Sequence, residues 1–253
     1  MNTCPSSAAG DFDPPQIPLS CSACPACARN LCQAVARAIG SLPEDPSTEI
    51  PQSVHLINAR RVIHWGQDFH DVVPLICEGW AASVYILSNG SRQILSILLP
   101  GDLASTALLF GAQAGCSVEA ITDVRYRTFA QADLKARLLN DADCFARFLR
   151  ACIDETARAD QLITDLGRRT AAERIARLIL NLQSRLMQRG MAQPETMEME
   201  FPLRHHHIAD ATGLSLVHVS KVLSEFRRSG IVKIGDRSLT ILEPEALQRI
   251  ALM

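Results

Sequence analysis

The spacing of apolar residues changes twice along the chain. Between residues 50 and 129, short apolar runs alternate with turn residues such as Asn89-Gly90 and Pro100-Gly101. An Asn-Gly pair between two such runs is a strong signal for a β-hairpin. Many short strands at regular intervals predict a small antiparallel β-barrel of the jelly-roll kind. The predicted strands cover residues 54–57, 72–77, 84–87, 94–99, 118–121 and 126–129.

From residue 133 the apolar period becomes helical, and a long helix is predicted from a cap at Asp141 to about Leu166. Its apolar positions recur at alternating spacings of four and three, which is the a/d pattern of a coiled coil. No residue of this seam is charged, so we interpret it as the contact of a homodimer; packing on the helix's own domain is the alternative. The seam comprises Phe145, Leu149, Cys152, Thr156, Ala159, Ile163 and Leu166.

The last third of the chain predicts a winged helix-turn-helix. A helix over 171–189 and a short strand over 195–203 come first. A helix over 207–212, a turn at Gly213 and a second helix from Ser215 to Arg228 follow, which is the helix-turn-helix pattern. Two short runs around the Gly235-Asp236 turn predict a closing hairpin, or wing.

The second helix of such a motif enters the major groove of DNA. Its predicted inward face is apolar, which leaves a polar and basic face for DNA; a helical hairpin with a solvated basic face is the alternative. Lys221 is a donor for guanine, whereas Arg227 and Arg228 suit phosphates. The predicted DNA-binding residues are Val217, His218, Ser220, Lys221, Ser224, Arg227 and Arg228.

We interpret the adjacent His205-His206-His207 run as a helix start, because neighbouring helical residues point in different directions, which disfavours a metal site.

The charge distribution agrees with two domains that have different partners. Residues 1–166 contain 12 Lys+Arg and 18 Asp+Glu, whereas residues 167–253 contain 13 and 9. A basic C-terminal part is compatible with nucleic-acid binding. The chain has no apolar run long enough for a membrane span and no secretory signal pattern, so we expect a cytoplasmic protein. No nucleotide-binding loop and no hydrolase motif is present, so we do not expect an enzyme.

Four of the nine cysteines lie within residues 21–32. In a cytoplasmic protein, cysteines are more often thiols, metal ligands or cluster ligands than structural disulfides. Cys144 and Cys152 fall at helical positions, where we expect small apolar fillers.

Four features resemble the CRP/FNR superfamily of bacterial transcription regulators: LPGDL at 99–103, TAAERIARLILNLQSRL at 170–186, IADATGLSLVHVSKVLSEFRRSGIV at 208–232 and the Gly-rich turns of the barrel. The resemblance implies an α+β fold with an N-terminal barrel of the cyclic-nucleotide-binding kind, a long dimerisation helix and a C-terminal winged helix-turn-helix. It also implies a homodimer on a two-fold symmetric operator, with RNA polymerase as a partner for activation. We accordingly expect a disordered tail (1–20), a cysteine-rich sensor segment (21–40), the barrel (41–138), the dimerisation helix (139–168) and the DNA-binding domain (169–253).

The resemblance leaves the signal to be identified. Cys116 stands where the cyclic-AMP branch has its phosphate-binding arginine, so we expect no cyclic nucleotide. Cys21-x2-Cys24-x7-Cys32 resembles a spacing of the FNR branch, which senses oxygen with a [4Fe–4S] cluster, and thiolates are the usual ligands of such clusters. For the fourth ligand we choose Cys116, with Cys27 and Cys77 as alternatives. Zinc on Cys21, Cys24, Cys27 and Cys32 is a further hypothesis, as is a thiol switch, a small ligand or control by expression level alone.

The recognition helix departs from the FNR branch. That branch has Glu, two residues, then Ser-Arg, where this chain has Val217, Ser220 and Lys221. Valine does not accept a hydrogen bond from cytosine, and lysine lacks the arginine fork, so we expect a different operator. One hypothesis is that oxygen destroys the cluster and weakens the dimer. The neutral seam lacks a like-charge pair that would oppose dimerisation, so a dimer that persists when the signal changes is the alternative.

Overall fold

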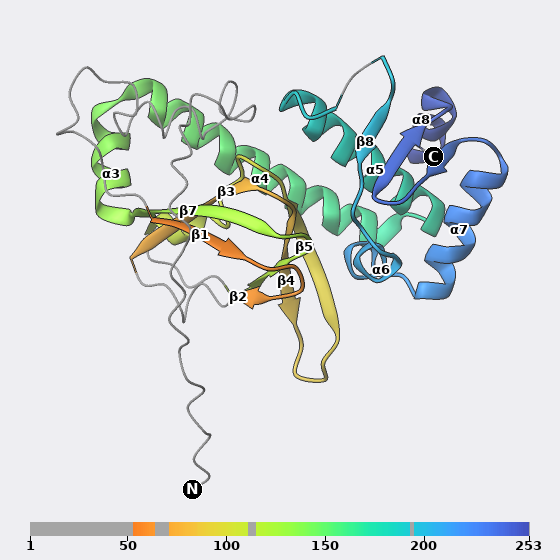
Figure 1. Ribbon diagram of the computed structural model, residues 1–253, viewed down its shortest axis with the longest axis horizontal. Helices are drawn as coiled ribbons and strands as arrows, with labels where there is room; N and C mark the ends of the chain where they lie inside the picture. The colour runs from red at the N-terminus through yellow and green to blue at the C-terminus, as the bar shows by residue number, and fades with distance from the viewer. Residues whose placement is uncertain (1–52, 64–70, 111–114, 193–194, 253) are drawn as a thin grey trace, which may run out of the picture.

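The computed structural model describes residues 53–63, 71–110, 115–192 and 195–252. The predicted tail (1–20) and the cysteine-rich segment (21–40), with Cys21, Cys24, Cys27 and Cys32, lie outside the described residues. In chain order the described part consists of antiparallel sheets, one long helix and a helix-turn-helix (Figure 1). The predicted α+β class is therefore confirmed. No helix of these residues is long and apolar enough to cross a membrane.

Two antiparallel sheets form the N-terminal domain. One has the order β1-β7-β3 and the other the order β2-β6-β4-β5. The Asn89-Gly90 turn joins β4 to β5 as predicted, and Gly90 has the positive φ of 82° that this turn demands. The strands are β1 (Ser53–Ile57), β2 (Val62–Ile63), β3 (Val72–Glu78), β4 (Ala81–Ile86), β5 (Arg92–Leu98), β6 (Ser117–Ala120) and β7 (Val124–Ala130).

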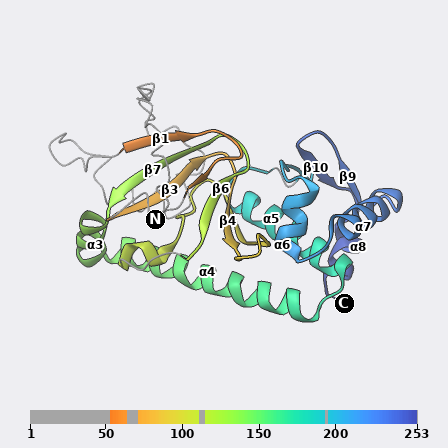
Figure 2. The same cartoon turned by 90° about the horizontal axis from the view of Figure 1, so that it is seen from below.

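Asp141 caps the long helix, as the sequence predicted, and a shorter helix ends directly before it. Asp141 ends α3 (Gln131–Asn140) and begins α4 (Ala142–Arg168), whose first turn it caps by accepting a hydrogen bond from the Cys144 N–H at 2.9 Å. The side chains of Cys144 and Phe148 anchor α4 in an apolar cluster of the sheet domain. Figure 2 shows α4 running beneath both the sheets and the C-terminal domain, so it is the structural link between them.

The C-terminal domain contains the predicted helix-turn-helix and wing, together with a last helix, α8, that the sequence analysis did not identify. Gly213 closes α6 with φ 63°, and a Cβ at this position would lie 2.9 Å from the Leu166 side chain. Both features explain the glycine in the turn. The elements are α5 (Ala171–Gln188), β8 (Glu198–Glu200), α6 (His205–Thr212), α7 (Leu216–Arg228), β9 (Val232–Ile234), β10 (Ser238–Ile241) and α8 (Pro244–Leu252).

The two domains share one apolar core. Trp80, Ile94 and Ile97 from the sheet domain belong to the same buried cluster as Ile175 and Ile179 of α5. The C-terminal domain is therefore packed directly onto the sheets as well as linked to them by α4.

Candidate DNA-binding surface and sensor residues

The helix α7 is fixed at its start and along one face. The Ser215 hydroxyl accepts a hydrogen bond from the His218 N–H, which makes Ser215 the N-cap that the sequence predicted. The apolar side chains on the inward face are buried: Val219, Val222, Leu223 and Phe226. This packing determines which face of α7 is turned to solvent.

All the residues that the sequence assigned to DNA are exposed: Val217, His218, Ser220, Lys221, Ser224, Arg227 and Arg228. Three of them take part in polar contacts on the same face. The His218 ring lies 3.1 Å from the Ser215 hydroxyl, and Arg227 donates to the Ser224 hydroxyl at 3.2 Å. Lys221 is the first cation along the helix. The arrangement gives a donor-rich face whose basic residues lie toward the C-terminal end, as phosphate contacts would require.

Leu216 is an exposed residue of this face that the sequence analysis missed. Its side chain is 54% exposed, and that of the adjacent Val217 is 76% exposed. Leu216 lies three residues before Val219 and seven before Leu223, so helical spacing alone would place it beside the buried face, and its exposure was not predictable from the pattern.

His207 serves the start of α6 as the sequence suggested. Its ring nitrogen Nδ1 accepts a hydrogen bond from the Arg204 N–H at 3.1 Å, while His205 and His206 are exposed. Burial, with the nearby His206, Arg92 and Arg204, lowers the pKa of His207 to about 4. The described residues contain no group of three or more His, Cys, Asp or Glu that could hold a metal ion.

Asp102, in the LPGDL stretch, is an ion-pair centre between the domains. Its carboxylate lies 2.6 Å from Arg185 and 2.5 Å from Arg189, both on α5, and accepts the Leu99 N–H at 2.8 Å. Arg185 also donates to the Ile97 carbonyl at 2.8 Å. Burial alone would raise the pKa of Asp102, but the charges of Arg185 and Arg189 outweigh it, and the pKa lies below its ordinary value. Asp102 therefore attaches the C-terminal domain to the sheets as a charged group.

Two further polar contacts join the same domains. Arg92 of β5 pairs with Glu119 of β6 and, at 3.3 Å, with Asp210 of α6. The Trp80 indole N–H donates to Glu200 of β8 at 3.2 Å. Because β8, α5 and α6 are all held, the orientation of the helix-turn-helix depends on the sheet domain.

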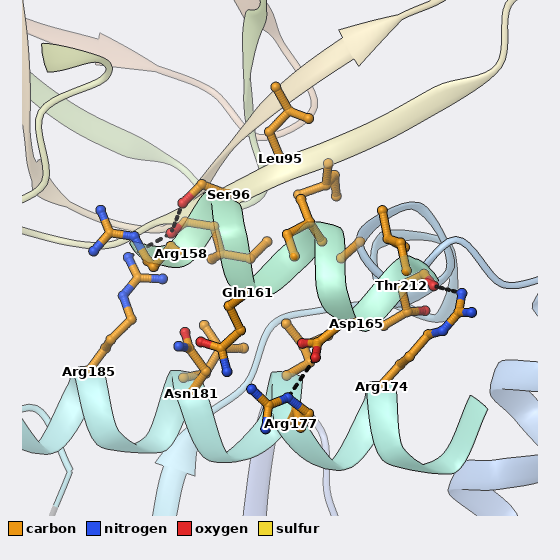
Figure 3. Close-up of a pocket in the computed structure, with 17 residues that line it drawn as sticks. Leu95, Ser96, Arg158, Gln161, Asp165, Arg174, Arg177, Asn181, Arg185 and Thr212 are labelled. Carbon is orange, nitrogen blue, oxygen red and sulfur yellow. Dashed lines mark hydrogen bonds and ion pairs between the residues drawn. The ribbon is translucent and has the colours of Figure 1, made fainter. Parts of the chain in front are cut away.

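A cavity of about 90 Å³ lies between β5, α4, α5 and α6, at the centre of this joint (Figure 3). Asp165 of α4 pairs with Arg177 of α5 at 2.7 Å on its wall. Arg174 points away from the cavity centre and donates to the Thr212 carbonyl of α6 at 3.1 Å. The long helix is thus connected by hydrogen bonds and ion pairs to the helices that position α7.

The predicted seam on α4 is largely open to solvent. Phe145, Leu149, Thr156, Ala159 and Ile163 are exposed, whereas Cys152 and Leu166 are half-buried. Cys152 packs against the apolar cluster of the sheet domain, and Leu166 lines the cavity of Figure 3. Ile153, which the sequence analysis did not include, is 54% exposed and continues the apolar stripe between Leu149 and Thr156.

Cys116 and Cys77 are the two described cysteines that the sequence proposed as ligands. Cys116 is half-exposed on the wall of a cavity of about 390 Å³, and its sulfur accepts a hydrogen bond from the Ser83 hydroxyl at 3.1 Å. Arginines of α4 and α5 surround that cavity: Arg147, Arg150, Arg158, Arg185 and Arg189. Cys77 instead packs against an apolar cluster and donates to the Leu75 carbonyl at 3.8 Å. Burial raises the pKa of both Cys144 and Cys152, which agrees with filler roles.

Comparisons with known proteins agree with this geometry. The family model "Crp-like helix-turn-helix domain" matches residues 173–250. The nitrogen fixation regulation protein FixK of Rhizobium meliloti is 28% identical over 205 residues, covering 79% of this chain and 88% of that protein. The transcriptional activator protein FnrL of Cereibacter sphaeroides is 28% identical over 190 residues, covering 73% and 75%.

The structure of FixK2 from Bradyrhizobium japonicum superposes with a TM-score of 0.67 at 26% identity, covering 79% of this chain and 98% of that one. The fumarate and nitrate reduction regulatory protein of Vibrio cholerae is 24% identical over 222 residues, covering 81% and 83%. FixK and FNR-type proteins are thus similar to this chain to a comparable degree.

Proposed function

Because this chain belongs to the CRP/FNR family of transcription regulators, we propose that it binds a two-fold symmetric DNA operator as a homodimer and adjusts that binding to oxygen or redox state. It is a DNA-binding regulator and not an enzyme. The observation that carries the operator proposal is α7, which combines a buried apolar face with an exposed face bearing Lys221, Arg227 and Arg228. RNA polymerase is the proposed protein partner.

The apolar stripe on α4 supports the homodimer. Phe145, Leu149, Ile153 and Ile163 are each about half exposed or more, and they follow one line along the helix. A second α4 in parallel would cover these side chains as a coiled coil and would place two copies of α7 for two half-sites. The stripe carries no charge, so the proposed dimer persists whatever the signal.

Glutamate in this stripe tests the dimer. Leu149→Glu combined with Ile163→Glu should give a monomer by light scattering and weaken operator binding. Thr164→Glu is the matched control, because Thr164 is exposed on α4 outside the stripe. A double variant that stays dimeric would contradict the α4 interface.

For the signal, we propose a [4Fe–4S] cluster on Cys21, Cys24, Cys32 and Cys116. Cys116 fits a ligand role because its side chain is half-exposed at a cavity wall. The lining has five arginines and three carboxylates (Asp102, Asp154 and Glu155), so cations outnumber anions around the thiol. Cys77 is less suited, since it packs among apolar side chains. When bound, such a cluster supplies oxygen-sensitive redox chemistry.

The residues around Cys116 provide a route to the DNA-binding domain. The cavity that Cys116 lines is also lined by Asp102, Arg185 and Arg189, the ion-pair centre between the domains. A change in the state of Cys116 therefore occurs in the same cavity as the contacts that hold α5. We propose that this proximity converts the signal into a changed orientation of the two α7 helices.

Anaerobic purification tests the cluster. The proposal predicts a brown protein with absorption near 400 nm and about four irons per chain, which bleaches in air. Cys116→Ser should reduce the iron content, whereas Cys152→Ser should not. A colourless, iron-free protein, prepared where a control cluster protein is loaded, would overturn the cluster; zinc or a reversible thiol change would then be the signal to measure.

A further inference from the structure

The first turn of α7 presents two aliphatic side chains to solvent. Leu216 is 54% exposed and Val217 is 76% exposed, while Val219, on the face opposite Val217, is fully buried. Both exposed residues lie at the end of the helix that contacts base edges in a helix-turn-helix. In a bound duplex these two apolar side chains would therefore face the edges of the bases.

The polar groups near this turn are already engaged or lie further along the helix. The Ser215 hydroxyl accepts the His218 N–H and lies 3.1 Å from the His218 ring. The first turn contains no acidic residue, so it offers no carboxylate to accept a hydrogen bond from cytosine N4. The first cation of the helix, Lys221, follows Val217 by about one turn.

Only one base edge in the major groove offers an apolar group, the C5 methyl of thymine. We infer that Leu216 and Val217 recognise thymine methyl groups, so that each half-site of the operator has thymine opposite the first turn of α7. Lys221 then donates hydrogen bonds to a neighbouring base pair. This inference rests on the proposed operator binding and adds the chemical basis of its specificity.

Deoxyuridine provides a direct test, because it pairs like thymidine but lacks the methyl group. The full-length protein is first used to select its operator from a random duplex library. Each thymine of the half-site is then replaced by deoxyuridine in both halves, and the dissociation constant is measured by fluorescence anisotropy. Losing one buried methyl costs about 4-fold in affinity, so two symmetric losses should weaken binding by about 16-fold.

Variants and a restored methyl group identify the residues responsible. Val217→Ser and Leu216→Ser should bind the thymine operator less tightly and lose their sensitivity to deoxyuridine. Lys221→Ala should also bind less tightly but remain sensitive. Where a contacted position is changed to a C·G pair, 5-methylcytosine should bind more tightly than cytosine. Circular dichroism confirms folding, which these surface substitutions should not alter.

Two results overturn the inference in distinguishable ways. If an operator is selected but deoxyuridine has no effect, or if both serine variants remain fully sensitive, the methyl readout is wrong and the proposed function stands. If no duplex is enriched at all, the proposed operator binding fails and the methyl readout fails with it.

Discussion

Replacing Asp102 by Asn tests whether the ion-pair centre stabilises the joint between the domains. The side chains of Asp102, Arg185 and Arg189 are only 12%, 9% and 10% exposed. Removing one partner of a buried pair costs about 3–5 kcal/mol, because the remaining charge is left without compensation. Asparagine keeps the shape and still accepts the Leu99 N–H, so we expect a loss near the lower end, about 3 kcal/mol.

The assay is urea unfolding at pH 7, compared with Asp154→Asn as the control. Asp154 pairs with Arg150 on the surface of α4, where the two side chains are 50% and 77% exposed. Such a pair contributes about 0.3–0.5 kcal/mol. If Asp102→Asn costs no more than this control, the ion-pair centre does not hold the domains together and the argument from its burial is refuted.

The pH dependence has a defined sign. The pKa of Asp102 in the folded protein is lowered below its ordinary value of 3.8. Its contribution to the free energy of unfolding is therefore complete above pH 3.8 and is lost as the pH falls below that value. Asp102→Asn should reduce this acid-induced loss of stability.

Two further substitutions or titrations probe the helix-turn-helix directly. The pKa of His207 is lowered from 6.5 to about 4, so NMR should show a neutral ring at pH 5.5. The free energy of unfolding should rise with pH between about 4 and 6.5, because the unfolded chain binds this proton more tightly than the folded protein does. A ring that titrates near 6.5 would contradict its burial. Gly213→Ala should cost more than about 1 kcal/mol, because φ is 63° and the new methyl would meet Leu166 at 2.9 Å. Gly230→Ala, with φ 69° and nothing within 4 Å, should cost less in the same thermal unfolding measurement; equal losses would show that the Leu166 contact contributes nothing.

The sequence predicted an element correctly where a few neighbouring residues determine a turn or a helix cap. The Asn89-Gly90 hairpin and the Ser215 cap are examples, since both depend on neighbouring residues alone. The a/d spacing was less reliable for α4. A step of one residue turns a helix by about 100°, so the same spacing rule chose the half-buried Cys152 and passed over the exposed Ile153.

Contacts between distant residues were beyond such patterns. Asp102 pairs with Arg185, 83 residues away, and the sequence analysis used Asp102 only as part of a family motif. The orientation of Cys116 into an arginine-lined cavity likewise depends on how the sheets pack against α4 and α5. Neither the hydrophobic period nor the residue types specify these partners, because both depend on the tertiary packing of separate elements.

The measurement that tests the central claim most directly is operator binding by variants of α7. With the selected duplex, Lys221→Ala should weaken binding by tenfold or more, and Arg227→Ala should reduce the salt dependence by about one unit per protomer. Arg249→Ala is the control, because Arg249 is a 72% exposed cation on α8. If Lys221→Ala and Arg227→Ala bind as tightly as the unmodified protein, with the same salt dependence, α7 is not the DNA-reading helix.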